Sequence, residues 1–280
     1  MALFGLRPGA PRLLQRARAA WDQEEMEEAA GLAARAERAA GRAGDGETRS
    51  EALALRAAAL NELGRSGEAL AAADALLAAE PEAADAMTER GFALWELNRL
   101  DEARAQLARA VEREPGDAWA HHVLGLVAER AGERKEAERR FRRARKLAPE
   151  DFPAPVRLAP DAFDAAVEAA LEEIPPRVRA YLANVAIAVE DLPADDDLRG
   201  SDPPLSPGIL GIFRGAPWGQ KGSMDPWSHF PSSIVLYQKN LERFAADRDD
   251  LVEEIGVTLV HEVGHFLGLD EEELWERGLG

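Results

Sequence analysis

A spacing of 34 residues that recurs through the N-terminal half of the chain constrains its fold most strongly. Three sets of positions keep this interval, one of prolines, one of alanines and one of small residues: Pro81, Pro115 and Pro149; Ala69, Ala103 and Ala137; Ala57, Gly91 and Gly125. Such a period is typical of stacked helix pairs, in which small residues lie where two helices cross and proline ends the second helix. It predicts an α-solenoid with repeats at about 50–83, 84–117 and 118–151.

The residues at fixed offsets within this period resemble those of tetratricopeptide repeats. The matching positions in the second and third repeats are Gly91, Leu94, Ala103, Ala110 and Pro115, then Leu124, Gly125, Ala137, Phe141, Ala144 and Pro149. Residues 11–45 look like a degenerate first repeat that caps the stack, so the predicted repeat domain spans 1–151. Arrays of this kind bind a peptide or protein partner on a face built from the first helix of each pair.

Five residues are candidates for that partner-binding face: Arg56, Arg90, Trp95, Trp119 and His122. Each of them could instead pack between repeats. His121 and His122 are expected to pack or to face solvent, because no other ligand-type pattern lies near them. The basic run from Arg130 to Lys146 is interpreted as a solvated last helix, with a docking surface for an acidic partner as the alternative.

Near its end the chain contains the pattern His-Glu-x-x-His, from His261 through Glu262 to His265. On a helix, positions i and i+4 share a face, so both imidazoles can bind one Zn²⁺. Glu262 is rotated by about 100° from His261, which suits a side chain that contacts a zinc-coordinated water. Because zinc lowers the pKa of that water to about 7, the pattern predicts a catalytic site with Glu262 as general base. The alternative is a helix with two surface histidines.

The residues before the pattern predict the helix that it requires. Apolar residues recur at helical spacing from Asp249 onward: Leu251, Val252, Ile255, Leu259, Val260, Val263 and Phe266. Asp250 and Glu253 are a plausible capping box at its start. Gly268 follows at a position that tolerates a left-handed turn and is expected to end the helix.

A catalytic zinc needs a third protein ligand and one open position. Metzincins place a histidine three residues after the glycine that follows this pattern, and counting from Gly268 gives Glu271. Carboxylates bind zinc, so we predict Glu271 as the third ligand, with Asp270 as its main rival. Asp270 is expected to form a hydrogen bond to a ligating histidine instead. The acidic residues from 272 to 276 fit the spacing less well.

From about Phe163 to the end, the chain resembles a small bacterial family of zincin-like metallopeptidases. The matching segments are Phe163–Pro175, Asn184–Pro193, Ile209–Gly215, Ser233–Tyr237 and the terminal pattern with Gly-Leu-Asp-Glu after it. The resemblance implies a small α+β zincin-like domain at about 160–280, with zinc on His261, His265 and an acidic third ligand. It implies no particular substrate.

Three segments of this half are predicted to be strands: Asn184–Leu192, Ile209–Phe213 and Ile234–Tyr237. A zincin binds an extended substrate along an edge strand, and either of the last two could be that edge. The long loop between them contains Trp218, Trp227 and Phe230, which could line a specificity pocket or fill the core. His229 and Tyr237 are weaker candidates for donors to the transition state.

Charge and composition limit the partners. Of the net charge of −18, residues 151–280 contribute −15, which disfavours a nucleic acid substrate because phosphate binding needs a basic surface. The chain has no cysteine, no apolar run long enough to span a membrane and no recognisable signal peptide at Met1, so we expect a cytoplasmic protein with no membrane partner.

Together these patterns predict a zinc metallopeptidase that cleaves a peptide or protein substrate, with repeats that bind a protein partner. The alternative is a binding scaffold whose zinc site is inactive or structural. The intact Glu262 favours the enzyme, because a structural site has no need of a general base.

Overall fold

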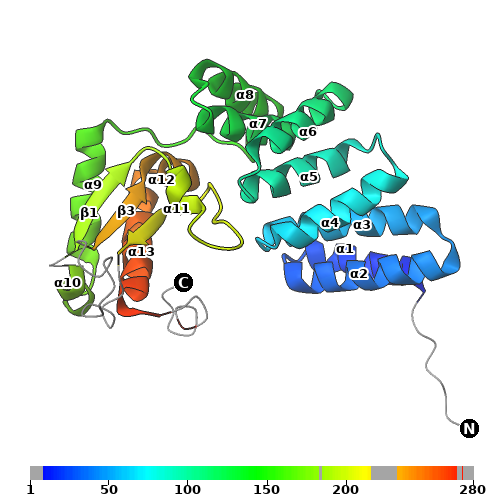
Figure 1. Ribbon diagram of the computed structural model, residues 1–280, viewed down its shortest axis with the longest axis horizontal. Coiled ribbons are helices and arrows are strands. Elements are labelled where there is room, and N and C mark those ends of the chain that lie inside the picture. Colours follow the sequence, from blue (N-terminus) through cyan, green and yellow to red (C-terminus); the bar gives the residue numbers. More distant parts are fainter. Residues whose placement is uncertain (1–8, 183–184, 216–231, 270–272, 274–280) are drawn as a thin grey trace, which may run out of the picture. The chain divides into compact units, whose positions relative to one another are not determined.

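The computed structural model describes residues 9–182, 185–215, 232–269 and 273 of the chain. The described residues divide into two compact units, with the boundary between Phe152 and Pro153. The first unit is helical, and the second combines helices with a three-stranded sheet (Figure 1). This confirms the predicted fold class of a helical solenoid followed by a small α+β domain.

The described part of the first unit consists of helix pairs that stack in chain order (Figure 1). The pairs are α1 (Ala10–Trp21) with α2 (Met26–Ala43), α3 (Gly46–Glu62) with α4 (Ser66–Ala79), α5 (Ala84–Glu96) with α6 (Leu100–Arg113), and α7 (Ala118–Arg130) with α8 (Arg134–Leu147). The degenerate first repeat therefore folds as a helix pair like the others. It ends at Gly44 in a left-handed conformation, with a φ of 71°, where the later repeats have a proline.

The periodic prolines end the second helix of each later pair. Helices α4, α6 and α8 stop at Ala79, Arg113 and Leu147, two residues before a proline. The residue next to each proline has left the helical conformation, with φ values of −129°, −127° and −138°. Steric conflict with the proline ring disfavours a helical residue at that position, so the helix ends there.

The periodic small residues lie where the two helices of a pair cross. A Cβ atom on Gly91 would lie 2.4 Å from Cγ of Leu107, and one on Gly125 would lie 2.5 Å from Cε1 of Phe141. Leu107 and Phe141 belong to the second helix of the same pair. Any larger residue at these glycines would push the two helices apart, which explains why small residues recur there.

The described part of the second unit begins with two helices, which are followed by three strands and three further helices. Its elements are α9 (Pro160–Glu173), α10 (Pro176–Leu182), β1 (Ala186–Glu190), α11 (Asp195–Leu198), β2 (Gly211–Arg214), β3 (Ser233–Tyr237), α12 (Gln238–Phe244) and α13 (Arg248–Leu267). The strand order is β1-β3-β2, with β1 parallel and β2 antiparallel to β3.

The strand order corrects one prediction. Ile234–Tyr237 was a candidate for the edge strand that binds substrate, but it belongs to β3, which lies in the centre of the described sheet. Both sides of β3 are already paired, so it has no open edge to offer a peptide. The other candidate, β2, does lie at an edge of the sheet that the described residues form.

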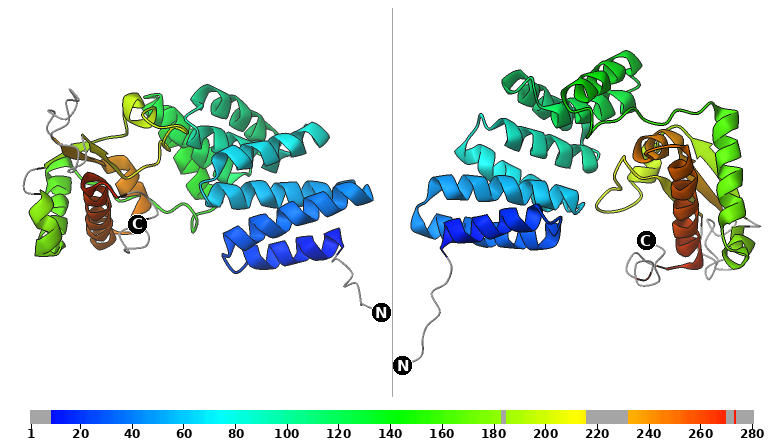
Figure 2. Two further views of the ribbon diagram at one scale, coloured as in Figure 1. Left: turned by 60° about the horizontal axis from the view of Figure 1, so that its bottom comes forward. Right: turned by 180° about the vertical axis from the view of Figure 1, so that it is seen from behind.

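One face of the sheet and two helices form the core of this unit. Side chains alternate between the two faces of a strand, and Ile234 and Leu236 of β3 point into the core. Phe163 of α9 and Leu259 of α13 pack into the same cluster, in which all four side chains are fully buried. The left view of Figure 2 shows the sheet lying over these helices. The core therefore holds α13 firmly against the sheet.

Candidate metal centre

Helix α13 contains the His-Glu-x-x-His pattern and is capped at both ends. Its N-cap is Asp247, whose carboxylate accepts hydrogen bonds from the backbone N–H groups of Asp249 and Asp250. The predicted capping box at Asp250 and Glu253 was therefore wrong by one turn. Asp250 still contributes, because it accepts a bond of 2.7 Å from the N–H of Ala246 and so ties down the preceding loop. The left-handed Gly268 ends the helix, as predicted, with a φ of 86°.

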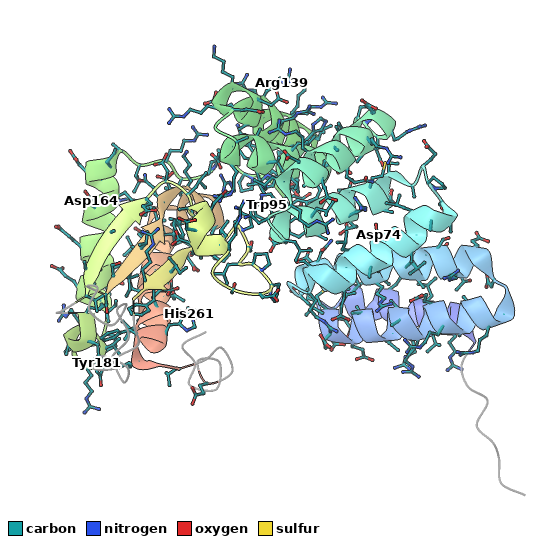
Figure 3. All side chains as sticks on the ribbon, viewed as in Figure 1. Asp74, Trp95, Arg139, Asp164, Tyr181 and His261 are labelled. Atoms are coloured by element: carbon teal, nitrogen blue, oxygen red, sulfur yellow. The ribbon has the colours of Figure 1, made fainter. Side chains whose placement is uncertain are left out.

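The buried apolar residues of α13 determine which way the His-Glu-x-x-His pattern faces. Five apolar residues at helical spacing are buried: Leu251, Ile255, Leu259, Val263 and Phe266. Because these side chains face the core, His261 and His265 lie on a partly exposed side of the helix. Figure 3 labels His261 on this helix. Glu262 lies between the two sides and is only 5% exposed. The helix thus presents two imidazoles together with a desolvated carboxylate.

The two imidazoles meet at their Nε2 atoms. These atoms lie 3.1 Å apart, and the ring planes of His261 and His265 are nearly perpendicular at 83°. The Nδ1 atom of His265 lies 3.2 Å from the carbonyl oxygen of Leu269. A carbonyl oxygen can only accept, so this hydrogen bond requires the proton on Nδ1 of His265, and in that tautomer Nε2 presents a lone pair. That lone pair points to the space shared with His261.

The turn that ends α13 places this carbonyl. The N–H of Leu269 donates to the carbonyl of Gly264 at 3.0 Å, and the N–H of Gly268 donates to the carbonyl of His265 at 2.9 Å. This pair of bonds is the Schellman motif, which requires a left-handed residue at Gly268. In metal sites, a ligating histidine commonly donates its other ring N–H to a backbone carbonyl, and this hydrogen bond fixes the orientation of the ring. The sequence showed the glycine, but not that its turn orients His265.

The edge strand β2 lies directly against the helix beside Glu262. A Cβ atom on Gly211 would lie 2.6 Å from Cγ2 of Thr258 and 3.6 Å from Cγ of Glu262. Two residues further along β2, the ring of Phe213 packs against Phe266 with centroids 5.5 Å apart. The sequence patterns did not indicate Gly211, which allows the backbone of an edge strand to approach the carboxylate of the pattern.

The predicted third ligand lies outside the described residues, as does its rival Asp270. Within the described ranges, no group of three or more His, Cys, Asp or Glu side chains is placed to hold a metal ion. His261 and His265 are therefore a pair, and Glu271 stays a prediction. The loop candidates Trp218, Trp227, Phe230 and His229 also lie outside the described residues.

Tyr237 does not reach the His-Glu-x-x-His pattern. The prediction that it could donate a hydrogen bond to the transition state is therefore wrong. Its side chain is fully buried, and its hydroxyl donates to Oδ2 of Asp197 at 3.0 Å. Burial, and next the negative charge of Asp197, raise the pKa of Tyr237. Along β3 it alternates with Leu236, so it lies on the face of the sheet opposite the core.

An ionic network on that opposite face joins the strands. Arg214 of β2 donates to both carboxylate oxygens of Glu190 at 2.7 and 3.0 Å, and to both of Asp197 at 2.8 and 2.6 Å. Hydrogen bonds to Asp197 and then to Glu190 raise the pKa of Arg214. Burial opposes ionisation of Asp197, but the bonds from Arg214 and Tyr237 outweigh it and lower the pKa of Asp197. The network therefore fixes the edge strand β2 in place.

The candidates for the partner-binding face differ in their contacts and in how far they are buried. Arg56 forms an ion pair with Glu37 at 2.9 Å, and Arg90 forms one with Asp74 at 2.6 Å, so both hold helices of the stack together. Trp95 is 7% exposed, whereas Trp119 and His122 are half-buried. His121 is buried between Arg140 and the carbonyl of Pro115, as expected for a packing residue. Burial lowers its pKa.

Solved structures that are similar to this chain include tetratricopeptide proteins. TTC0263, a tetratricopeptide protein of Thermus thermophilus, is 23% identical, with 50% of this chain and 75% of that chain covered and a TM-score of 0.44. MamA of Desulfovibrio magneticus is 21% identical, with coverage of 49% and 75% and a TM-score of 0.42. YrrB, a tetratricopeptide protein with an unusual peptide-binding site, is 22% identical, with coverage of 50% and 70% and a TM-score of 0.41.

A search of curated proteins finds no match. Among the described residues, no helix has the length and apolar character needed to cross a membrane. Two family models match separate parts of the sequence: residues 60–127 match a tetratricopeptide repeat, and residues 182–279 match the zincin-like metallopeptidase family. The chain therefore joins tetratricopeptide repeats to a zincin-like metallopeptidase domain.

Proposed function

We propose that the chain is a zinc-dependent peptidase, with His261 and His265 as zinc ligands and Glu262 as general base. The observation that supports it most is the distance of 3.1 Å between the two Nε2 atoms. Two nitrogens bound to one tetrahedral zinc at about 2.0–2.1 Å would lie roughly 3.3 Å apart. The pair therefore fits a shared zinc ion with little movement. Glu271 is the proposed third ligand, on the spacing argument alone.

In the proposed reaction, the metal and Glu262 have different tasks. Zinc supplies Lewis acidity, which lowers the pKa of a coordinated water to about 7 and polarises a peptide carbonyl. The carboxylate of Glu262 accepts the proton of the attacking water and donates it to the leaving amine. Its low exposure of 5% strengthens this interaction, because little bulk water screens it.

The edge strand β2 is the proposed platform for the substrate. Among the described strands, β2 pairs only with β3, so its other edge is unpaired. Gly211 allows the backbone of β2 to lie next to Glu262. An extended peptide can add to such an edge by main-chain hydrogen bonds. These bonds do not depend on the side chains of the peptide, so peptides of different sequence can bind. The scissile carbonyl would then lie along the strand that passes beside the general base.

The repeat domain, proposed to span residues 1–151, binds a peptide or protein partner in this account, and residues 160–280 are the peptidase domain. Stacked repeats usually expose an extended binding face. The two family models support a division of labour between binding and chemistry. We propose a cytoplasmic protein that uses neither nucleic acid nor membrane as its partner.

Metal analysis combined with a cleavage assay tests the proposal. Purified protein is expected to contain close to one zinc per chain and to cleave an unfolded protein mixture, and a chelator is expected to stop cleavage. In His265→Ala, both zinc and cleavage should fall together. Unchanged zinc content in His265→Ala, or cleavage that persists with chelator, would show that the proposed site is not the catalyst.

A further inference from the structure

Aromatic rings form a continuous patch on the first helices of the last two repeats and on the residues that follow α8. We call it the aromatic patch: Phe92 and Trp95 of α5, Trp119 and His122 of α7, and Phe152. The rings of Phe92 and Trp119 meet edge to face with centroids 4.9 Å apart, and His122 stacks on Phe152 at 4.8 Å. Four of the five residues are half-buried rather than enclosed. A ligand can therefore contact the patch, because part of its ring surface remains exposed.

Carboxylates adjoin the aromatic patch along α5. Asp85 and Glu89 precede Phe92 by seven and three residues, so all three lie on one side of the helix. Burial, with smaller contributions from the charges of Glu62, Asp117 and Asp85, raises the pKa of Glu89 to about 7, although the hydrogen bond from Asn61 opposes the shift. Within the described residues, no Lys or Arg forms an ion pair with Asp85, Glu89 or Glu62.

The arginines expected on this face are occupied elsewhere. Arg56 pairs with Glu37 and Arg90 pairs with Asp74, so neither neutralises Glu89. The carboxylates next to the aromatic patch therefore lack a cation from the described part of the chain. A negative field beside exposed ring faces attracts a positively charged group.

Two buried polar atoms in the same region have no hydrogen-bond partner among the described residues: Nε1 of Trp95 and Oδ1 of Asn61. Their residues are only 7% and 5% exposed. Asn61 Nδ2 already donates to Glu89, at 2.7 Å to its carboxylate and 3.0 Å to its carbonyl. A buried indole N–H without an acceptor is costly, and a ligand carbonyl would satisfy it.

We propose that the aromatic patch, with Asp85 and Glu89, binds a partner segment in which a lysine or arginine lies next to a large apolar side chain. The cationic group pairs with Glu89 and lies against the ring of Phe92, while the apolar side chain packs on Trp119 and His122. A backbone carbonyl of the segment can accept from the indole of Trp95. The proposal rests on the protein-binding part of the proposed function, and it names the chemistry of the partner.

Peptide pools test this specificity. Three fluorescein-labelled pools of short peptides share a fixed leucine followed by arginine, alanine or glutamate, with the other positions randomised. Binding to the full chain is measured by fluorescence anisotropy in the Glu262→Gln background with chelator present. These conditions remove cleavage, so the result does not depend on whether the chain is a peptidase.

The arginine pool should bind about tenfold more tightly than the glutamate pool, which corresponds to about 1.4 kcal/mol, because hydrogen bonds between charged groups are stronger than neutral ones. Glu89→Gln keeps the shape and can keep the bond to Asn61, and it should remove most of this preference. Phe92→Leu should weaken the arginine pool more than the alanine pool, because it removes the ring against which the cationic group lies. Glu112→Gln, an exposed carboxylate on α6, is the matched control and should leave binding unchanged.

Thermal melts of each variant show that it is folded. Equal binding of the arginine and glutamate pools, tighter binding of the glutamate pool, or no binding of any pool would overturn the proposal. So would an arginine preference that survives in both Glu89→Gln and Phe92→Leu, because the segment would then bind elsewhere on the chain.

Discussion

The Nε2 atoms of His261 and His265 face each other at 3.1 Å on one side of helix α13. This relationship depends on more than their spacing along the helix. The carbonyl of Leu269 fixes the ring of His265 through its Nδ1 atom, and Gly268 fixes the turn that places this carbonyl. The end of the helix is therefore part of the candidate metal centre.

Gly268→Ala should weaken zinc binding, although residue 268 contacts no metal in this account. Its φ of 86° costs an alanine about 1–2 kcal/mol, so the turn shifts and the Leu269 carbonyl leaves His265. Loss of such a supporting bond typically lowers metal affinity about 10–100-fold. Competition with a chromophoric chelator measures the affinity.

Gly256→Ala is the control for this variant. Gly256 lies inside α13, and a Cβ atom there would meet nothing within 4 Å. Alanine is favoured over glycine in a helix by about 1 kcal/mol, so this variant should be slightly more stable with unchanged zinc affinity. If both variants bind zinc as the wild type does, the turn does not support the site.

The repeats could be predicted from the sequence because their contacts are local and periodic. Gly91 and Gly125 recur at the period and lie at helix crossings, where only small residues fit. The two histidines of the pattern could also be predicted, since a helix brings positions i and i+4 together. Local geometry determines both features.

The surroundings of the site could not be predicted, because distant segments create them. Gly211 contacts Thr258 across 47 positions of sequence, and no pattern in either segment indicates this approach. The side chains of β3 alternate between the two faces of the sheet, and this directs Tyr237 to Asp197. The sequence alone does not show which segments lie beside that strand. The N-cap shifted from Asp250 to Asp247 because both acidic residues suit the position, and only the path of the chain decides between them.

Glu271→Ala should reduce zinc affinity far more than Asp270→Ala. The spacing from Gly268 puts residue 271 where a third ligand is expected, whereas Asp270 is expected to bond to a histidine ligand. Zinc titrations of both variants at equal protein concentration compare the losses. A larger loss of zinc affinity in Asp270→Ala than in Glu271→Ala would make Asp270 the third ligand. Wild-type zinc affinity in both variants would show that neither residue is a ligand.

Gly211→Ala should lower turnover by displacing β2 from the helix that contains Glu262. The added methyl group would lie 2.6 Å from Cγ2 of Thr258, and overpacking of this kind costs about 1–3 kcal/mol. Thr258→Ser removes that Cγ2 atom and should restore part of the turnover and melting temperature when combined with Gly211→Ala. A double variant no better than Gly211→Ala would mean that this contact does not position the strand.

The stability of the repeat unit should fall as the pH rises toward neutrality. The pKa of Glu89 is raised from 4.5 to about 7 in the folded state, chiefly by burial, with Glu62, Asp85 and Asp117 nearby. A raised pKa means that the folded chain holds this proton more tightly, so the contribution is complete below pH 4.5 and is lost as the pH passes about 7. Urea unfolding of the full chain, followed by circular dichroism, measures it.

Glu89→Gln should flatten this pH dependence, because the amide does not titrate. Glu112→Gln alters an exposed carboxylate and should retain the wild-type slope. Parallel slopes in Glu89→Gln and the wild type would show that Glu89 does not titrate in this range.

We propose that zinc on the two histidines and the carboxylate of Glu262 together cleave peptide bonds. The most direct measurement determines zinc content and the rate of cleavage of an unfolded protein in the same preparations of wild type and Glu262→Gln. Loss of a general base typically costs about 10²–10⁴ in rate, so Glu262→Gln should keep its zinc and lose turnover by that factor. Equal rates in both proteins, or no cleavage by zinc-loaded wild type, would contradict the account and favour a binding scaffold with a structural zinc.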